Sequence, residues 1–211
     1  MTDDLIDHET KKPTLYFIII GSVVFAAILL FLIFGFNHEK PSNKVEYGYF
    51  TFEEIGGLWQ TEIKIDNQLY QAMFRFNPKQ VEDVHIEGNF SGFHSSPIYI
   101  TFDPEAQKDD FKYLALASTE LSLNIVRALN FTVEGACTKN ATAACTDRPI
   151  VNCGDEGKSV IYITPNPPPQ IVLKGSCVML TGERMDLLKS VDRMLYQWYH
   201  IMSQNSALNN P

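Results

Sequence analysis

The longest hydrophobic run of the chain lies near its N-terminus. Leu15 to Phe36 reads LYFIIIGSVVFAAILLFLIFGF, about 22 residues without a charged side chain. As a helix this run would span roughly 33 Å, which matches the hydrocarbon core of a bilayer. Lys11 and Lys12 precede the run, so the positive-inside tendency places the N-terminus in the cytoplasm. The pattern predicts one transmembrane helix, with the following residues outside the cytoplasm.

Two kinds of processed leader have similar hydrophobic runs. A cleaved signal peptide normally has a shorter apolar core and a small-residue cleavage site, and no such site follows Phe36. A pilin-type leader is clipped at a small residue before its assembly helix, and Lys-Lys-Pro-Thr before Leu15 offers none. We therefore favour an uncleaved anchor over both alternatives.

Alternation of apolar and polar residues is clearest between Trp59 and Ile65. This is the period of a half-buried strand. Asp66 and Asn67 supply a turn, and residues 68–76 return with apolar side chains on one face. The segment is therefore expected to form a β-hairpin.

Two later stretches change to helical spacing. Between Asp109 and Leu129 apolar residues recur every three or four positions, and Asp109 or Asp110 could cap the N-terminus of a core-facing helix. A final helix is expected over residues 182–202. It is amphipathic, with Leu187, Leu188, Val191, Leu195 and Trp198 on one face and Lys189, Asp192, Arg193 and Gln197 on another.

The remaining strands are short. The order strands, long helix, strands, helix is typical of an α+β two-layer sandwich. If two strands flank the long helix as a crossover unit, they should be parallel, with a right-handed connection. We expect those two strands at 97–102 and 148–153, and further strands at 84–87, 159–163 and 170–180. The expected fold class is α+β: an N-terminal transmembrane helix followed by a two-layer mixed-sheet ectodomain with two main helices.

These elements divide the chain into five parts. After the anchor and a short stalk some 160 residues remain, the size of one ordinary domain. The expected parts are a cytoplasmic tail at 1–14, the transmembrane helix at 15–36, a stalk at 37–47, an extracytoplasmic α+β domain at 48–202 and a polar tail at 203–211.

The charge of the chain argues against one class of partner. The formal net charge is -8 and the pI is about 5.1. Binding to nucleic acid needs a basic face, and the lysines and arginines do not cluster. We therefore expect no nucleic-acid partner.

All four cysteines, Cys137, Cys145, Cys153 and Cys177, follow the predicted anchor. An oxidising compartment would favour two disulfides. Zinc is the alternative, but the spacing has no C-x2-C knuckle, and the same absence disfavours a thioredoxin-like redox pair. Of the three possible connectivities we prefer Cys137 with Cys145, closing a small loop, and Cys153 with Cys177, joining two predicted strands.

Three Asn-x-Ser/Thr sequons also follow the anchor, at Asn89, Asn130 and Asn140. Outside the cytoplasm they would be accessible to glycosylation. Roughly one or two such triplets would arise by chance in a chain of this composition. They support an external location weakly.

Two groups of polar residues are candidates for a site. Four of these residues, His85, Glu87, His94 and Asp103, lie on or beside two strands that could be neighbours. Imidazoles with a carboxylate can bind zinc or move protons. Their spacing matches no known ligand pattern, so scattered surface histidines are the alternative.

The second group lies on the long helix. Glu120, Asn124 and Arg127 share one stripe, as a polar ligand site or a general-acid pair would require. A solvated helix face with a weak ion pair is the alternative.

No catalytic motif accompanies these candidates. The serines lie in no G-x-S-x-G elbow and beside no S-x-x-K pair. The sequence therefore indicates no catalytic residue, no bound metal and no cofactor.

Four segments of the predicted outer domain resemble those of a known group of proteins. They are IYITFDP (Ile98–Pro104), LALASTELSLNI (Leu114–Ile125), RPIVNC (Arg148–Cys153) and VDRMLYQWYHIM (Val191–Met202). In these segments the chain resembles a group of uncharacterised, single-pass membrane proteins predicted in small-genome archaea. The resemblance would cover most of the outer domain and implies an envelope location, but no mechanism.

Three classes of function remain. The leading hypothesis is a non-catalytic, membrane-anchored extracytoplasmic module that contacts the bilayer through residues 15–36 and binds another envelope protein or copies of itself. The alternative is an envelope hydrolase or metal-dependent enzyme that uses His85, His94, Asp103 or Glu120. Thiol redox chemistry is a third class, and it would require unpaired cysteines.

Overall fold

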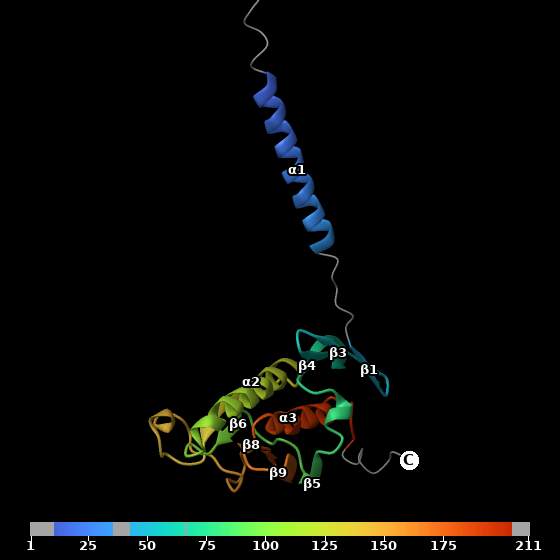
Figure 1. Cartoon of the computed structure of the whole chain (residues 1–211). Helices are drawn as coiled ribbons and strands as arrows, with labels where there is room; N and C mark the ends of the chain where they lie inside the picture. Colours follow the sequence, from blue (N-terminus) through green and yellow to red (C-terminus); the bar gives the residue numbers. More distant parts are fainter. Residues whose placement is uncertain (1–10, 36–42, 66, 204–211) are drawn as a thin grey trace, which may run out of the picture. The chain divides into compact units, whose positions relative to one another are not determined.

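The computed structural model describes residues 11–35, 43–65 and 67–203, and separates two compact units, Met1–Ser42 and Asn43–Pro211. In the first unit, α1 (Lys11–Gly35) is a 25-residue helix (Figure 1). Its side chains are described for residues 16–32, and all of them are exposed. Within the described residues, no helix meets the length and hydropathy of a membrane span.

The second unit begins with a four-stranded antiparallel sheet in the order β1-β2-β3-β4. The expected hairpin is confirmed as β3 (Leu58–Ile65) and β4 (Gln68–Phe74); Asp66 of its turn lies outside the described residues. Two strands of this sheet were not expected from the sequence: β1 (Lys44–Tyr47), which lies in the expected stalk, and β2 (Phe50–Ile55).

A turn of two glycines joins β2 to β3. Gly56 and Gly57 both have positive φ, 62° and 80°, as the type I′ hairpin turn requires. This Gly-Gly pair is the local signal that could have located β2.

The larger sheet has six strands in the order β5-β9-β10-β8-β6-β7. Only β9 and β10 pair antiparallel, and the other neighbours are parallel, so the sheet is mixed as expected. Its strands are β5 (His85–Phe90), β6 (Ile98–Phe102), β7 (Val133–Cys137), β8 (Ser159–Thr164), β9 (Gln170–Gly175) and β10 (Cys177–Thr181).

The parallel crossover uses a different second strand from the one expected. β6 passes through α2 (Phe111–Ala128) to β7, which pairs parallel with β6. The expected strand at 148–153 is wrong, because Ile150 forms only an isolated bridge to Cys137. Two backbone hydrogen bonds, from Cys137 to Pro149 and from Val151 to Cys137, hold that segment against the end of β7.

The expected single strand at 170–180 is two strands. Lys174 of β9 pairs with Cys177 of β10, which leaves Gly175 and Ser176 as a two-residue turn. Gly175 has a φ of 60°, a conformation that glycine adopts without steric cost.

The helices α2 and α3 (Met185–Trp198) lie between the two sheets (Figure 1). The buried residues of α2 recur at helical spacing, as predicted, although Asp110 makes no capping hydrogen bond. On the side of the small sheet, Phe52 and Phe74 pack against the ring of Tyr196. The expected two layers are therefore three, because a second sheet covers the helices.

This second sheet changes the environment of α3. Asp192 and Arg193, predicted on its polar face, are buried, with 1% and 2% of their surface exposed. The Nη2 atom of Arg193 donates to the carbonyl of Ser203 at 2.6 Å. The amphipathic pattern was misleading here, because α3 is covered on both faces and not on one.

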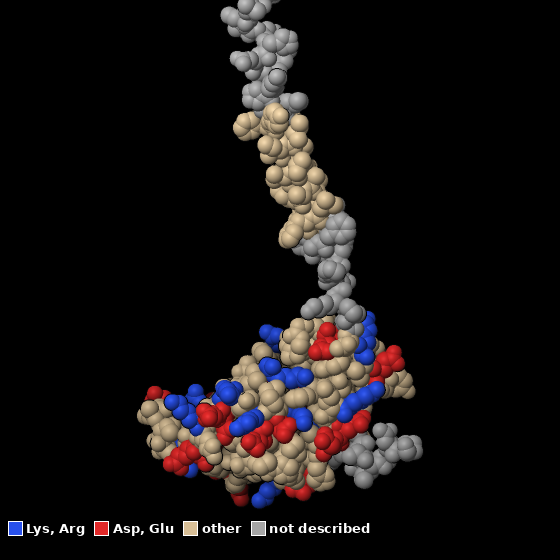
Figure 2. Space-filling view, viewed as in Figure 1, with Lys and Arg blue, Asp and Glu red and all other residues tan. Residues whose placement is uncertain are grey.

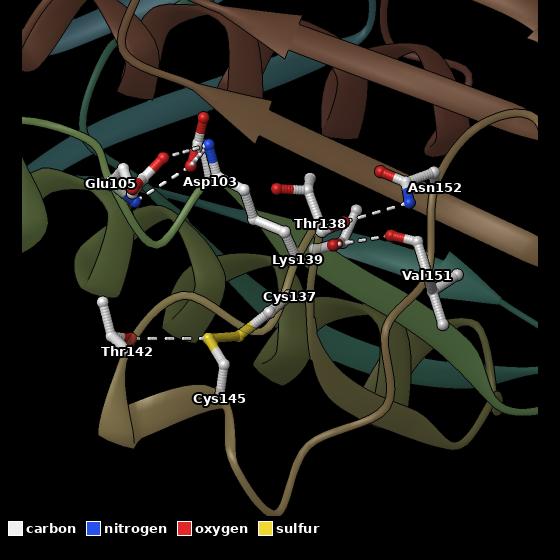
Figure 3. Close-up of a disulfide and its surroundings, with 10 residues drawn as sticks. Asp103, Glu105, Cys137, Thr138, Lys139, Thr142, Cys145, Val151 and Asn152 are labelled. Atoms are coloured by element: carbon white, nitrogen blue, oxygen red, sulfur yellow. Dashed lines mark hydrogen bonds and ion pairs between the residues drawn. A yellow bond between two sulfur atoms is a disulfide. The ribbon is translucent and has the colours of Figure 1, made fainter.

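Both preferred disulfides are confirmed: Cys137 pairs with Cys145 and Cys153 with Cys177. The first closes the small loop shown in Figure 3. The second ties β10 to a loop, since Cys153 lies outside any strand. Disulfides of this kind indicate an oxidising compartment.

Candidate ligand-binding groove

A groove of about 250 Å³ lies between the edge strand β4 and the helix α2. Its walls are mostly apolar, and a few polar groups lie among them. The sheet contributes Leu58, Ile63, Tyr70 and residues 71–75, and the helical layer contributes Leu116, Thr119, Glu120, Leu123, Asn124, Arg127, Ala128 and Tyr199.

The polar stripe predicted on α2 faces this groove. Glu120, Asn124 and Arg127 follow one another at intervals of four and three residues, and all three line the groove. Glu120 and Asn124 are half-buried, whereas Arg127 is exposed. The alternative of a fully solvated helix face is therefore wrong for Glu120 and Asn124.

Glu120 is held by an arginine that follows β4. The Nε atom of Arg75 donates to Oε1 of Glu120 at 2.5 Å. Within the described residues, the buried Oε2 atom has no hydrogen-bond partner. Burial raises the pKa of Glu120, and the nearby Arg75 guanidinium opposes that shift. Arg75 and Glu120 thus join the small sheet to α2 at the groove.

Asp192 fixes the same end of β4 from α3. Its Oδ2 atom accepts the backbone N–H groups of Arg75 and Phe76, each at 2.9 Å. Burial holds the pKa of Asp192 well above its usual range; these N–H donors oppose the shift, and the charge of Glu120 adds to it. The hydroxyl of Tyr196 donates to the carbonyl of Phe76 at 2.5 Å. The backbone after β4 is thereby anchored to the helical layer.

Asn124 is oriented by two hydrogen bonds. Its Oδ1 atom accepts the hydroxyl of Tyr199 at 2.6 Å, and its Nδ2 atom donates to the carbonyl of Glu120 at 2.8 Å. Burial raises the pKa of Tyr199, so this hydroxyl stays protonated and remains a donor. Both side chains line the groove in fixed orientations.

The rim of the groove exposes apolar surface. Met73 on the strand side and Leu123 on the helix side line the groove, and 45% and 42% of their surfaces are exposed. Arg127 lies on the helix side, where it forms no ion pair with any residue that the structure describes. The groove is therefore open to solvent, apolar at its rim and flanked by a guanidinium.

The other polar candidates do not come together. His85 lies on β5 and Asp103 follows β6, and three strands separate β5 from β6. His94 contacts Ser91, with 3.2 Å between Nε2 and Oγ, and Asp103 pairs with Lys139 at 3.3 Å (Figure 3). The expectation that the two strands are neighbours is wrong. Among the described residues no group of His, Cys, Asp or Glu could hold a metal ion.

Both disulfides bear on the thiol-redox hypothesis. All four cysteines lie in the described part of the chain, and none of them is free. Thiol redox chemistry needs an unpaired cysteine, and the described part of the chain has none.

The asparagines of the three sequons, Asn89, Asn130 and Asn140, are all exposed. Exposure is a necessary condition for glycosylation. Whether these sites are used stays a prediction.

Sequence reasoning did not place Arg75 or Tyr199 beside the polar stripe of α2. Both residues follow regular elements, and no motif marks either of them. The only local signal is the change at Arg75 from the alternating pattern of the hairpin to a charged residue. Their role becomes visible only when the fold brings β4, α2 and the end of α3 together.

Comparisons with protein-family models, with curated proteins and with solved structures found no match for this chain.

Proposed function

We propose that this chain is a membrane-anchored, extracytoplasmic binding module whose ligand occupies the groove between β4 and α2. The observation that carries the proposal is the groove itself, which combines exposed apolar side chains with fixed polar groups. Ligand sites commonly have this composition: apolar walls with a small number of oriented polar groups.

The anchor is the uncharged run Leu15–Phe36, of which the structure describes the side chains of residues 16–32. Residues 15–35 of this run belong to α1, and Figure 2 shows no acidic or basic side chain among the described atoms of that helix. Lys11 and Lys12 before the run support a cytoplasmic N-terminus. The disulfides of the following domain agree with an oxidising side of the membrane.

The chemistry of the groove supports binding more than catalysis. None of its lining residues is a histidine, serine or cysteine. The hydroxyl of Thr119 donates to the carbonyl of Ala115 at 2.8 Å, and the Glu120 carboxylate is paired with Arg75. These contacts leave no nucleophile with an adjacent base, which group-transfer enzymes usually have.

The face shown in Figure 2 carries acidic and basic side chains side by side, without an extended area of one charge. This mixture does not favour a polyanionic partner such as nucleic acid. We propose instead an envelope partner that the groove recognises through apolar contact.

Photo-crosslinking tests the proposal in membranes of the expressing cell. A photoreactive phenylalanine analogue would replace Leu123 in the groove, or Ile150 as the control. Ile150 is matched in exposure, at 40% against 42%, and does not line the groove. We expect a specific adduct from position 123 and none from position 150. Equal labelling at both positions, or no adduct at 123, would contradict the proposal.

A further inference from the structure

The two sheets end in four edge strands, and one of them differs from the rest. β1 carries Lys44 and Glu46, β5 carries Glu87 and β7 carries Glu134. Charged residues on an edge strand hinder pairing with another chain. β4 reads QLYQAMF and has neither a charged residue nor a proline. It is the edge that is least protected against a further strand.

This unprotected edge is also one wall of the groove. Five successive residues, Gln71 to Arg75, line it. Within the described residues β4 pairs with β3 and with no other strand. The next backbone donors along the chain, Arg75 and Phe76, are bound by Asp192, which fixes the end of the edge while the strand itself stays open.

The groove is small for a free organic ligand. Such sites usually have volumes of roughly 300–1,000 Å³, and this one has about 250 Å³. A single apolar side chain of an extended peptide fills less space than a whole organic ligand. The rest of the peptide lies along the strand edge, where main-chain hydrogen bonds supply most of the affinity.

The charges that line the groove indicate the sign of the preferred ligand. Glu120 is paired with Arg75, so these two charges offset each other. Arg127 remains as an exposed cation at the groove. An acidic side chain on the ligand would complement it.

We propose that the groove binds an extended peptide segment of a partner protein, which adds to β4 as a further strand. The segment places a large apolar side chain between Tyr70, Phe74 and Leu123 and an acidic residue near Arg127. This inference rests on the proposed function, because it names the ligand class of the same groove.

The test uses the full chain in lipid nanodiscs and a phage-displayed library of random linear peptides as the probe. We expect the selected peptides to contain a large apolar residue and an acidic residue. Leu123→Arg should weaken their binding about tenfold or more, because a charged side chain would block the apolar pocket. Ile150→Arg, at the matched exposed position outside the groove, should leave it unchanged. Thermal melting checks that both variants remain folded.

Two further measurements distinguish strand addition from contact through side chains alone. N-methylation of the peptide amides that face β4 should abolish binding, while N-methylation of the alternate set should not. Amide hydrogen exchange should slow in β4 on peptide binding and stay constant in β1, the opposite edge of the same sheet.

Failure of this inference can be separated from failure of the proposed function. Peptides that tolerate both sets of N-methylation and leave β4 exchange unchanged would overturn strand addition. If the library yields no binder and position 123 gives a lipid or small-molecule adduct, the ligand is not a peptide. The groove would still be a binding site. No binder and no adduct would overturn both.

Discussion

Asp192 places a carboxylate in the interior of the domain, where it accepts two backbone N–H groups from the segment after β4. Burying a charged carboxylate is costly unless hydrogen bonds compensate, and its Oδ1 atom has no partner among the described residues. The neighbouring charge of Glu120 adds to that cost. Burial is therefore the main reason that the pKa of Asp192 is raised in the folded state.

The raised pKa of Asp192 predicts a stability that falls as the pH rises. Above the pKa of an unfolded aspartate, about 3.9, the unfolded chain has released a proton that the folded chain retains. The free energy of unfolding then decreases by up to about 1.4 kcal/mol per pH unit for one such group, until the pH passes the folded-state pKa. Glu120, whose pKa is also raised, acts in the same direction.

Urea unfolding of the full chain in detergent, with the disulfides intact, measures this slope. Asp192→Asn keeps an acceptor oxygen for Arg75 and Phe76 but cannot titrate, so the variant should lose part of the decrease in the pH range above about 4. An identical slope in the variant, or a wild-type chain that becomes more stable across this range, would refute the assignment.

At the scale of elements, α2 has two apolar stripes with different roles. One stripe is buried in the core and includes Leu121, which is fully buried; the other includes Leu123, 42% exposed at the groove. Residues two positions apart on a helix point in different directions. Substitutions at these two leucines should therefore separate stability from binding.

Leu121→Ala should destabilise the chain by about 2–5 kcal/mol, because it removes buried methyl groups and leaves a cavity. Leu123→Ala should change stability by less than about 0.5 kcal/mol and weaken binding of the selected peptides at the groove. Urea unfolding measures the first effect. A large loss of stability in Leu123→Ala would mean that its side chain is part of the core and does not form a binding surface.

Elements with a strict period could be predicted from the sequence. The hairpin of β3 and β4 and the helix α2 follow from spacing alone. β7 could not be predicted, because its five residues, VEGAC, include a glycine and show no clear alternation. The segment 148–153 has a stronger pattern than β7 but pairs through one bridge only. Tertiary pairing, which local pattern does not encode, decided between them.

The candidate site was predictable only in part. The stripe of Glu120, Asn124 and Arg127 follows from helix geometry, and all three line the groove. Arg75 and Tyr199 come from segments far away in sequence, and only the packing of the small sheet on the helices brings them to α2. The burial of Asp192 has the same cause.

At the scale of the whole molecule, the proposed anchor would confine binding to the membrane surface. The wild-type chain should stay in the membrane pellet after alkaline washing. Two lysines in the run, Phe25→Lys with Leu29→Lys, should release it, because each costs about 2.5–3.5 kcal/mol at the centre of a transmembrane helix. A control with lysine at Ile55, exposed on β2, should stay in the pellet. A wild-type chain that alkaline washing removes would contradict the anchor.

The most direct test of the central claim is co-purification from membranes of the expressing cell, with partners quantified by mass spectrometry. Wild type, Leu123→Arg and Ile150→Arg would be compared at equal expression. The binding function predicts a partner that the wild type and Ile150→Arg retain equally and that Leu123→Arg loses by about tenfold or more. A partner that Leu123→Arg retains at the wild-type level would contradict the assignment of the groove as the binding site.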